Sequence, residues 1–206
     1  MKVSPAIASA APKGRPREFC VDQALAAALR VFWRKGFDGA SLTDLTEAMG
    51  ITRPSLYAAF GNKEELFRKA LDLYGREKLA YVQAALSEPS ARAVAERMLR
   101  GSLDIITSSC DPAGCFGVVS SVACTDHADS IRAEVVARRA ASEQAMIARF
   151  ERAHAEGDLP ANVEPEGLAR YVMAIMSGMS VQASAGASRA DLEQLIDIAL
   201  QVWPSR

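Results

Sequence analysis

Apolar residues recur with a helical period along nearly the whole sequence, and no segment alternates apolar and polar residues as a strand would. The first apolar stripe, which Gly36 ends, consists of Leu25, Ala28, Leu29, Phe32 and Trp33. This periodicity predicts an all-α protein. The chain has 206 residues, of which 50% are hydrophobic, so it can bury one extended core or the cores of a small and a medium domain.

Two short helices joined by a tight turn follow at about residues 41–60. Ser41 and Thr52 stand at the positions of N-caps, and Gly50 and Gly61 end the helices that these residues begin. A brief second helix with a polar front is typical of a helix-turn-helix, in which that helix enters the major groove of DNA. The pattern therefore makes double-stranded DNA the expected partner.

The charge distribution agrees with a DNA-binding front. The formal net charge of the chain is only -1, yet residues 1–75 carry 11 Lys and Arg against 8 Asp and Glu, whereas the remainder carries 13 and 17. Positive charge is thus concentrated around the helix-turn-helix, where phosphates would be contacted. Asn62 then caps a long helix that we expect to continue through Tyr81.

The chain closely resembles the TetR family of bacterial transcriptional regulators. The resemblance is carried by GRPR at 14–17, by ALRVFWRKGFDGASLTDLTEAMGITRPSLYAAFGNKEELFRKAL at 28–71 and by a weaker likeness of GMSVQASAGASRADLEQL at 178–195. It implies an N-terminal three-helix helix-turn-helix DNA-binding domain over residues 15–75. A larger helical bundle for ligand binding and dimerisation would follow over 76–206, with about nine helices in all.

Phosphate contacts supply most of the affinity for DNA and base contacts supply the choice of sequence. We expect hydroxyls at the front of the second short helix, and a lysine beside the next helix N-terminus, to hold phosphates: Thr52, Ser55, Tyr57 and Lys63. By resemblance to the family, Ser41 and Thr43 would hold the backbone on the other side of the groove.

Arg53 is the expected reader of a base, because its planar fork matches guanine O6 and N7. Pro54 shares the first turn with Arg53 and belongs to the same DNA-facing set. Arg15 and Arg17 are expected to reach an adjacent minor groove as an arm. Ala58 departs from the family pattern, which has a bulky or imidazole side chain there, so this position offers no hydrogen bond to a base.

The remainder of the chain is predicted to form five further helices in a bundle. The breaks between them fall at 87–90, 110–114, 124–129, 157–167 and 184–188. The segment 168–181 is apolar almost all round and therefore has to be covered on two sides. Together with the last helix it resembles the family's intersubunit four-helix bundle, which implies a homodimer; the alternative is a helix central to its own domain. The expected interface comprises Leu168, Val172, Ile175, Met179, Leu192, Leu195, Ile196, Ala199 and Trp203.

The resemblance also implies an unidentified small-molecule effector held in the bundle. Soft apolar side chains suit an adaptable pocket, although methionines at helical spacing also serve as ordinary core. The candidate pocket residues are Met98, Leu103, Ile106, Phe116, Met146, Phe150, Met173 and Met176.

Three cysteines, Cys110, Cys115 and Cys124, cluster around a glycine-containing loop with His127 nearby. Three interpretations stay open: buried reduced thiols, a thiol sensor of electrophiles or oxidants, or a metal site. The spacing lacks the tight pairing of closed zinc sites, so we expect no metal. The same DNA-binding scaffold would serve a thiol sensor.

Residues 1–14 lack the continuous apolar stretch of an export signal, so we predict a disordered tail. No stretch approaches the roughly 18 to 20 apolar residues of a bilayer span, and we expect no membrane partner. Four cysteines without an export signal favour reduced thiols and a cytoplasmic protein.

The sequence offers little equipment for catalysis: no Ser/His/Asp set, no glycine-rich phosphate loop, and only two histidines. We expect no enzyme and no cofactor. There are two alternatives: a helical enzyme or carrier with an attached helix-turn-helix, and an interaction module whose front helices bind protein instead of DNA. The favoured hypothesis is a dimeric repressor released from a pseudo-palindromic operator by its effector, although an activator would use the same parts.

Overall fold

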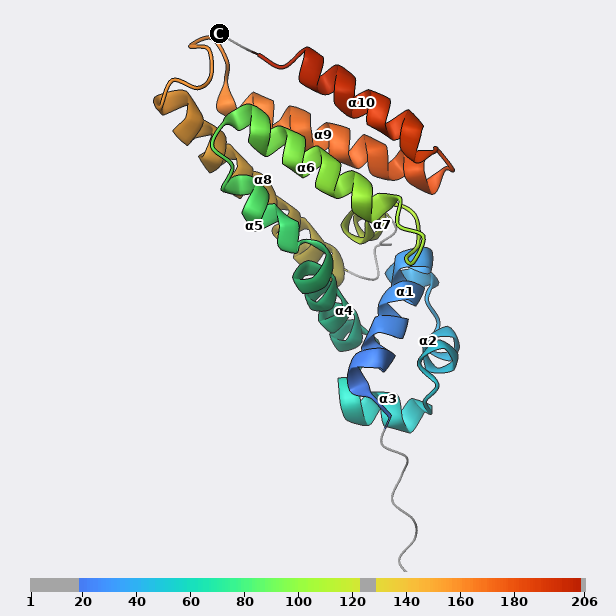
Figure 1. The fold of residues 1–206 in the computed structure, drawn as a ribbon. Coiled ribbons are helices and arrows are strands. Elements are labelled where there is room, and N and C mark those ends of the chain that lie inside the picture. The colour runs from blue at the N-terminus through green and yellow to red at the C-terminus, as the bar shows by residue number, and fades with distance from the viewer. Residues whose placement is uncertain (1–18, 123–128, 205–206) are drawn as a thin grey trace, which may run out of the picture.

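The computed structural model describes residues 19–122 and 129–204, and over these residues the chain is all-α, as the periodicity predicts (Figure 1). The described residues form the helices α1 (Val21–Gly39), α2 (Leu42–Met49), α3 (Arg53–Phe60), α4 (Lys63–Lys78), α5 (Ala80–Leu86), α6 (Ala91–Ile106), α7 (Phe116–Val122), α8 (Asp129–Ala155), α9 (Pro165–Ser184) and α10 (Arg189–Gln201). The predicted tail at 1–14 and the predicted arm of Arg15 and Arg17 lie outside the described residues.

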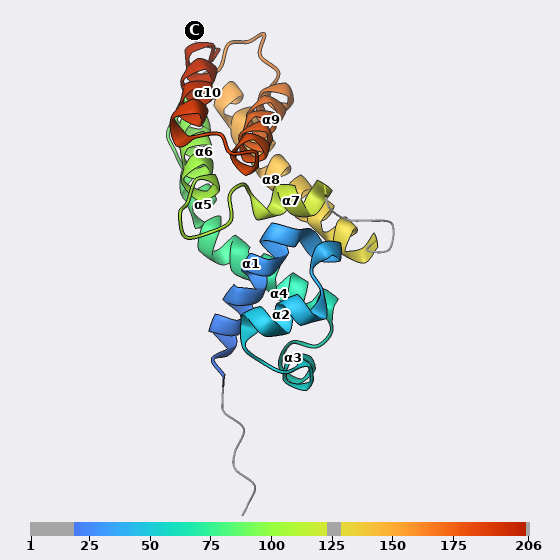
Figure 2. The same cartoon turned by 90° about the vertical axis from the view of Figure 1, so that its right-hand side faces the viewer.

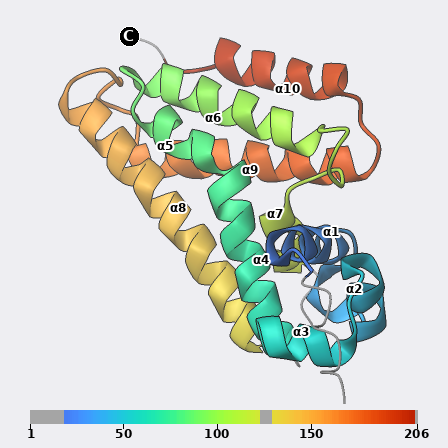
Figure 3. The ribbon, with the colours of Figure 1, turned by 60° about the horizontal axis from the view of Figure 1, so that its bottom comes forward.

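The helices are arranged in two regions. The helices α1 to α4 gather at one end, with α3 at the tip, while α5, α6, α9, α10 and much of α8 form a bundle at the other end (Figures 1 and 2). The long helix α8 runs back alongside α4 (Figure 3). None of the described helices is long and apolar enough to cross a membrane.

Three boundaries differ from the sequence-based expectation. Gly36, with φ of 68°, interrupts α1 as expected, but helical residues continue to Gly39. The predicted long helix divides at Leu79, where ψ is 9°, into α4 and α5; this division gives ten helices in the described residues instead of about nine. Helix α9 begins at Pro165 inside the expected break, because proline is well accommodated in the first turn of a helix.

The protein has two clusters of buried side chains. One is built mainly from α1 to α4 and the other from α5, α6, α9, α10 and the second half of α8. The first cluster also includes Phe116 of α7 and Ile131 and Val135 of α8. The core beneath the helix-turn-helix thus recruits residues from far beyond position 75.

Phe116 makes the central contact between α7 and this first cluster. Its ring is fully buried and packs against Trp33, Phe67 and Tyr74, with ring centroids 6.1, 5.4 and 5.5 Å away. Aromatic pairs at these distances stabilise a core beyond the area that they bury. Phe116 therefore joins α7 to α1 and α4.

The substitution Phe116→Ala should lower the free energy of unfolding by about 3–5 kcal/mol, because it leaves a cavity among three aromatic rings. Urea denaturation followed by circular dichroism measures the change. Val136→Ala on α8 is the control; its side chain is 54% exposed, and the expected change is within about 0.5 kcal/mol. Equal effects of the two substitutions would contradict a central role for Phe116.

Candidate nucleic-acid interface and ligand pocket

The start of α2 is fixed by a reciprocal cap. The Ser41 hydroxyl accepts a hydrogen bond from the Asp44 backbone N–H at 3.0 Å, and the Asp44 carboxylate accepts one from the Ser41 N–H at 3.0 Å. Lys35 of α1 donates to the same carboxylate at 2.6 Å. Lys35 and the Ser41 N–H together lower the pKa of Asp44 to about 2. The capping box therefore also ties α2 to α1.

The turn between α2 and α3 depends on a glycine. Gly50 has φ of 66° and ψ of 30°, a left-handed conformation that other residues adopt only at a cost. The N–H groups of Gly50 and Ile51 donate to the carbonyls of Glu47 and Thr46 at 3.2 and 3.1 Å. This arrangement closes α2 and directs the chain into α3.

Helix α3 has a buried side and an exposed polar front. Leu56 and Phe60 are fully buried, whereas Arg53 and Pro54 are exposed and Tyr57 is 49% exposed. Two buried anchors one turn apart hold so short a helix on the core. Its front is left free at the tip of the molecule (Figure 2).

Hydrogen bonds connect several of the predicted DNA-binding side chains. The Thr52 hydroxyl accepts from the Ser55 N–H at 3.4 Å and lies 3.0 Å from the Ser55 hydroxyl. The Arg53 guanidinium donates to the exposed Thr43 hydroxyl on α2 at 2.9 Å. Sequence reasoning assigned Arg53 and Thr43 to DNA separately and missed the bond between them, because it joins side chains of two helices.

Lys63 begins α4 and is half-buried. Its ammonium lies 4.5 Å from the centre of the Phe37 ring, a cation–π contact at the end of α1. Burial lowers the pKa of Lys63, and the charge of Asp38 opposes that effect. Lys63 thus has a packing role within the protein that its position in the sequence does not indicate.

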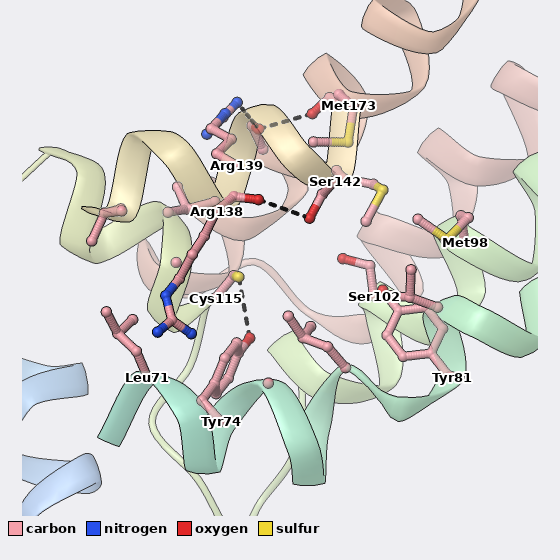
Figure 4. A pocket seen from close by; sticks show the side chains of 18 residues that line it. Leu71, Tyr74, Tyr81, Met98, Ser102, Cys115, Arg138, Arg139, Ser142 and Met173 are labelled. Carbon is pink, nitrogen blue, oxygen red and sulfur yellow. Dashed lines mark hydrogen bonds between the residues drawn. The ribbon is translucent and has the colours of Figure 1, made fainter. Parts of the chain in front are cut away.

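A cavity of about 250 Å³ is lined by residues of the six helices α4 to α9 (Figure 4). Of the eight predicted pocket residues, Met98, Met173 and Met176 line it. The other five are buried in the packed core and do not line the cavity: Leu103, Ile106, Phe116, Met146 and Phe150. The lining residues that sequence reasoning missed include Tyr74, Tyr81, Ser102, Arg138 and Arg139. For Tyr74 and Tyr81 the only signal in the sequence is their place in the long helix that was expected to continue through Tyr81.

Tyr74 connects the cavity to the aromatic core. Its hydroxyl lies 3.2 Å from the Cys115 sulfur (Figure 4), and its ring packs edge-on against Trp33 with centroids 5.0 Å apart. Burial, followed by the neighbouring Cys115, raises the pKa of Tyr74 well above its ordinary value. The tyrosine is therefore neutral and acts as a hydrogen-bonding wall of the cavity.

The three cysteines of the predicted cluster have different environments. Cys110 is exposed, Cys115 is partly buried in the cavity wall, and Cys124 lies with His127 outside the described residues. The Cys115 backbone N–H donates to the Ser180 hydroxyl of α9 at 2.7 Å. Within residues 19–122 and 129–204, no group of three or more His, Cys, Asp or Glu side chains is placed to hold a metal ion.

Most of the predicted dimer residues lie in the core of their own chain. The buried ones are Leu168, Val172, Met179, Leu192, Ile196, Ala199 and Trp203, and Ile175 and Leu195 pack partly buried against them. The exposed apolar side chains of this region are instead Tyr171, Val181, Ile198 and Val202, which are 39%, 57%, 56% and 65% exposed.

A capped helix-turn-helix with an exposed front, followed by a helical bundle with a cavity, is the architecture of a class of DNA-binding regulators. Residues 24–70 match the model of the bacterial regulatory proteins of the tetR family, and residues 95–199 match the tetracyclin repressor-like C-terminal domain. The chain belongs to the TetR family and is a DNA-binding transcriptional regulator, not an enzyme.

Several relatives match over most of their length. The transcriptional repressor ComR of Escherichia coli is 34% identical over 93% of this chain and 92% of its own, and the repressor BdcR of Escherichia coli is 31% identical over 88% and 86%. A cysteine-substituted form of the TetR family regulator CifR, solved in complex with a 26-base-pair double-strand operator DNA, is 41% identical with a TM-score of 0.86. The match covers 92% of this chain and 100% of that CifR chain.

The capping box of α2 should make stability depend on acid. Because the folded pKa of Asp44, about 2, lies below the value near 3.9 of an unfolded aspartate, the carboxylate stabilises the fold above about pH 4 and loses that effect as the pH falls toward 2. The substitution Asp44→Asn should therefore lower the melting temperature at pH 6, and the difference from wild type should vanish near pH 2.

Melting curves by circular dichroism across this pH range provide the measurement. Glu77→Gln, which alters an exposed carboxylate of α4, is the control and should leave the melting temperature unchanged at every pH. A difference between Asp44→Asn and wild type that stays constant from pH 6 to pH 2 would contradict the assignment.

Proposed function

We propose that this chain is a transcriptional repressor that binds a pseudo-palindromic operator as a homodimer and leaves it when a small molecule occupies the cavity between α4 and α9. The observation that carries the proposal is the geometry of α3, a two-turn helix anchored by Leu56 and Phe60 with Arg53 exposed at its tip. The repressors ComR and BdcR, and the operator complex of CifR, support it.

On DNA, the front of α3 lies in the major groove. Arg53 reads a guanine through its fork, with Pro54 beside it in the first turn. The hydroxyls of Thr52, Ser55 and Tyr57 bind phosphates next to α3, and those of Ser41 and Thr43 bind the backbone at the start of α2. Affinity falls with salt because cationic side chains at this surface, such as Lys63, release counterions when they neutralise phosphates.

The dimer forms through the outer faces of α9 and α10. These helices lie side by side at the end of the molecule away from α3 (Figure 1). Val181 of α9, Ile198 of α10 and Val202, which directly follows α10, are each more than half exposed, whereas β-branched side chains are more often buried. A second copy covers these side chains, together with the partly buried Ile175 and Leu195.

The effector acts through two residues that line the cavity and connect it to the helices of the DNA-binding region. Tyr74 is part of α4 and touches α1, and Arg138 of α8 donates to Asp72 of α4 at 2.6 Å. A ligand that fits the cavity better when α4 is displaced shifts the population toward spacings of the two α3 helices that do not fit the operator.

The operator assignment is tested by Arg53→Ala in a selection of bound sites from random DNA. Specific affinity should fall by about 1–3 kcal/mol, and the preference at one base pair of each half-site should be lost. Lys63→Ala should weaken binding to all DNA sequences alike. Arg76→Ala, at the exposed end of α4, serves as the control. An Arg53→Ala protein with unchanged base preference would contradict the assignment of Arg53 to base reading.

The dimer assignment is tested by Ile198→Glu, which places a charge on the exposed face of α10. Desolvating this charge should weaken self-association by about tenfold or more, and sedimentation velocity over a concentration series measures the change. Val136→Glu on α8, at a side chain of similar exposure, should leave association unchanged. Dimers that persist in the Ile198→Glu protein would place the interface elsewhere.

A further inference from the structure

The charge of the cavity wall is one-sided. Most of its lining is apolar, and the only charged side chains among the described lining residues are Arg138 and Arg139 of α8. Among the described residues, no carboxylate lines the cavity. Arg138 is paired with carboxylates outside the cavity, whereas Arg139 has no ion pair within the described residues, so a cationic ligand would be repelled at Arg139 and an anionic group attracted.

The two arginines differ in what they already bind. Arg138 donates to Asp72 at 2.6 Å and to Glu134 at 2.7 Å, so its charge is used to join α8 to α4. Arg139 donates to the Ser177 hydroxyl of α9 at 2.9 Å and forms no ion pair within the described part of the chain. A guanidinium has five N–H donors, so most of the fork of Arg139 is available to a ligand.

An apolar surface leads inward from Arg139. Figure 4 shows Arg139 near Met173 on one side of the cavity and Met98 with Tyr81 on another. Thioether side chains adapt to flexible alkyl groups better than branched ones do. The cavity volume of about 250 Å³ leaves room for a short or medium alkyl chain.

We infer that the cavity binds a small amphipathic carboxylate, with its anionic group on Arg139 and its apolar chain between Met98, Met173 and Met176. The inference rests on the proposed role of the cavity as the effector site. It specifies the chemistry of the ligand, and it excludes lipophilic cations. Tyr74 and Cys115 then lie beside the bound chain, at the wall that is shared with the DNA-binding region.

The test is calorimetric titration of the full chain, without DNA, with three ligands of equal chain length: octanoate, methyl octanoate and octylamine. Octanoate should bind, and the neutral ester and the cationic amine should bind at least about tenfold more weakly. Arg139→Gln should weaken the binding of octanoate by about tenfold, as expected for the loss of a charge-assisted hydrogen bond. It should leave the affinity for the ester unchanged.

Two further variants locate the site. Arg132→Gln removes an exposed arginine of the same helix that does not line the cavity, and it should leave octanoate binding unchanged. Ser102→Leu adds volume at a 6% exposed lining residue of α6 and should abolish octanoate binding. A circular dichroism spectrum like that of wild type shows that the leucine variant folds; if it does not fold, the comparison of Arg139→Gln with Arg132→Gln decides alone.

Three results would overturn the inference: ester or amine binding as tight as octanoate, an unchanged octanoate affinity in Arg139→Gln, or no octanoate binding by a protein that still selects operator DNA. This last result leaves the proposed function intact. Conversely, a protein that binds octanoate through Arg139 but selects no DNA sequence refutes the proposed function alone.

Discussion

The contact of Phe116 with Trp33, Phe67 and Tyr74 holds the two regions of this protein together. Phe116 is fully buried, and by sequence it belongs to the C-terminal half, yet it packs among rings of α1 and α4. Because Tyr74 also lines the cavity, one side chain borders both the ligand site and the core beneath the helix-turn-helix. Close-packed rings transmit displacement and do not absorb it.

A second connection runs parallel to the aromatic one. Arg68 of α4 donates to Glu134 of α8 at 2.8 Å, and Arg138 of α8 donates to Asp72 of α4 at 2.6 Å. Each pair is partly exposed and individually contributes little to stability. The two pairs nevertheless connect α8 to α4 at two positions.

The sequence was sufficient for the helix-turn-helix because its signals are local. Caps at Ser41 and Thr52 and a left-handed Gly50 specify α2 and α3 within a few residues of chain. The cavity depends on which of many apolar side chains face the space between six helices. The sequence marks both Met98 and Leu103 as apolar and inward-facing, but it does not show that Met98 lines the cavity while Leu103 packs in the core. Similarly, the apolar segment with Val172 and the last helix with Ile196 indicate burial, but periodicity does not say whether the covering atoms belong to the same chain.

The bond between Arg53 and Thr43 has a consequence for operator reading that neither residue has alone. A free arginine side chain on the surface has rotamer entropy worth up to about 2 kcal/mol, and base recognition requires most of it to be lost. In the free protein, the Thr43 hydroxyl at 2.9 Å already confines the guanidinium above the α2–α3 turn. An exposed hydrogen bond of this kind is cheap to exchange for one to a base or phosphate. If Arg53 reads a base as proposed, this bond restricts its side chain before DNA binds, and it does so by joining α3 to α2.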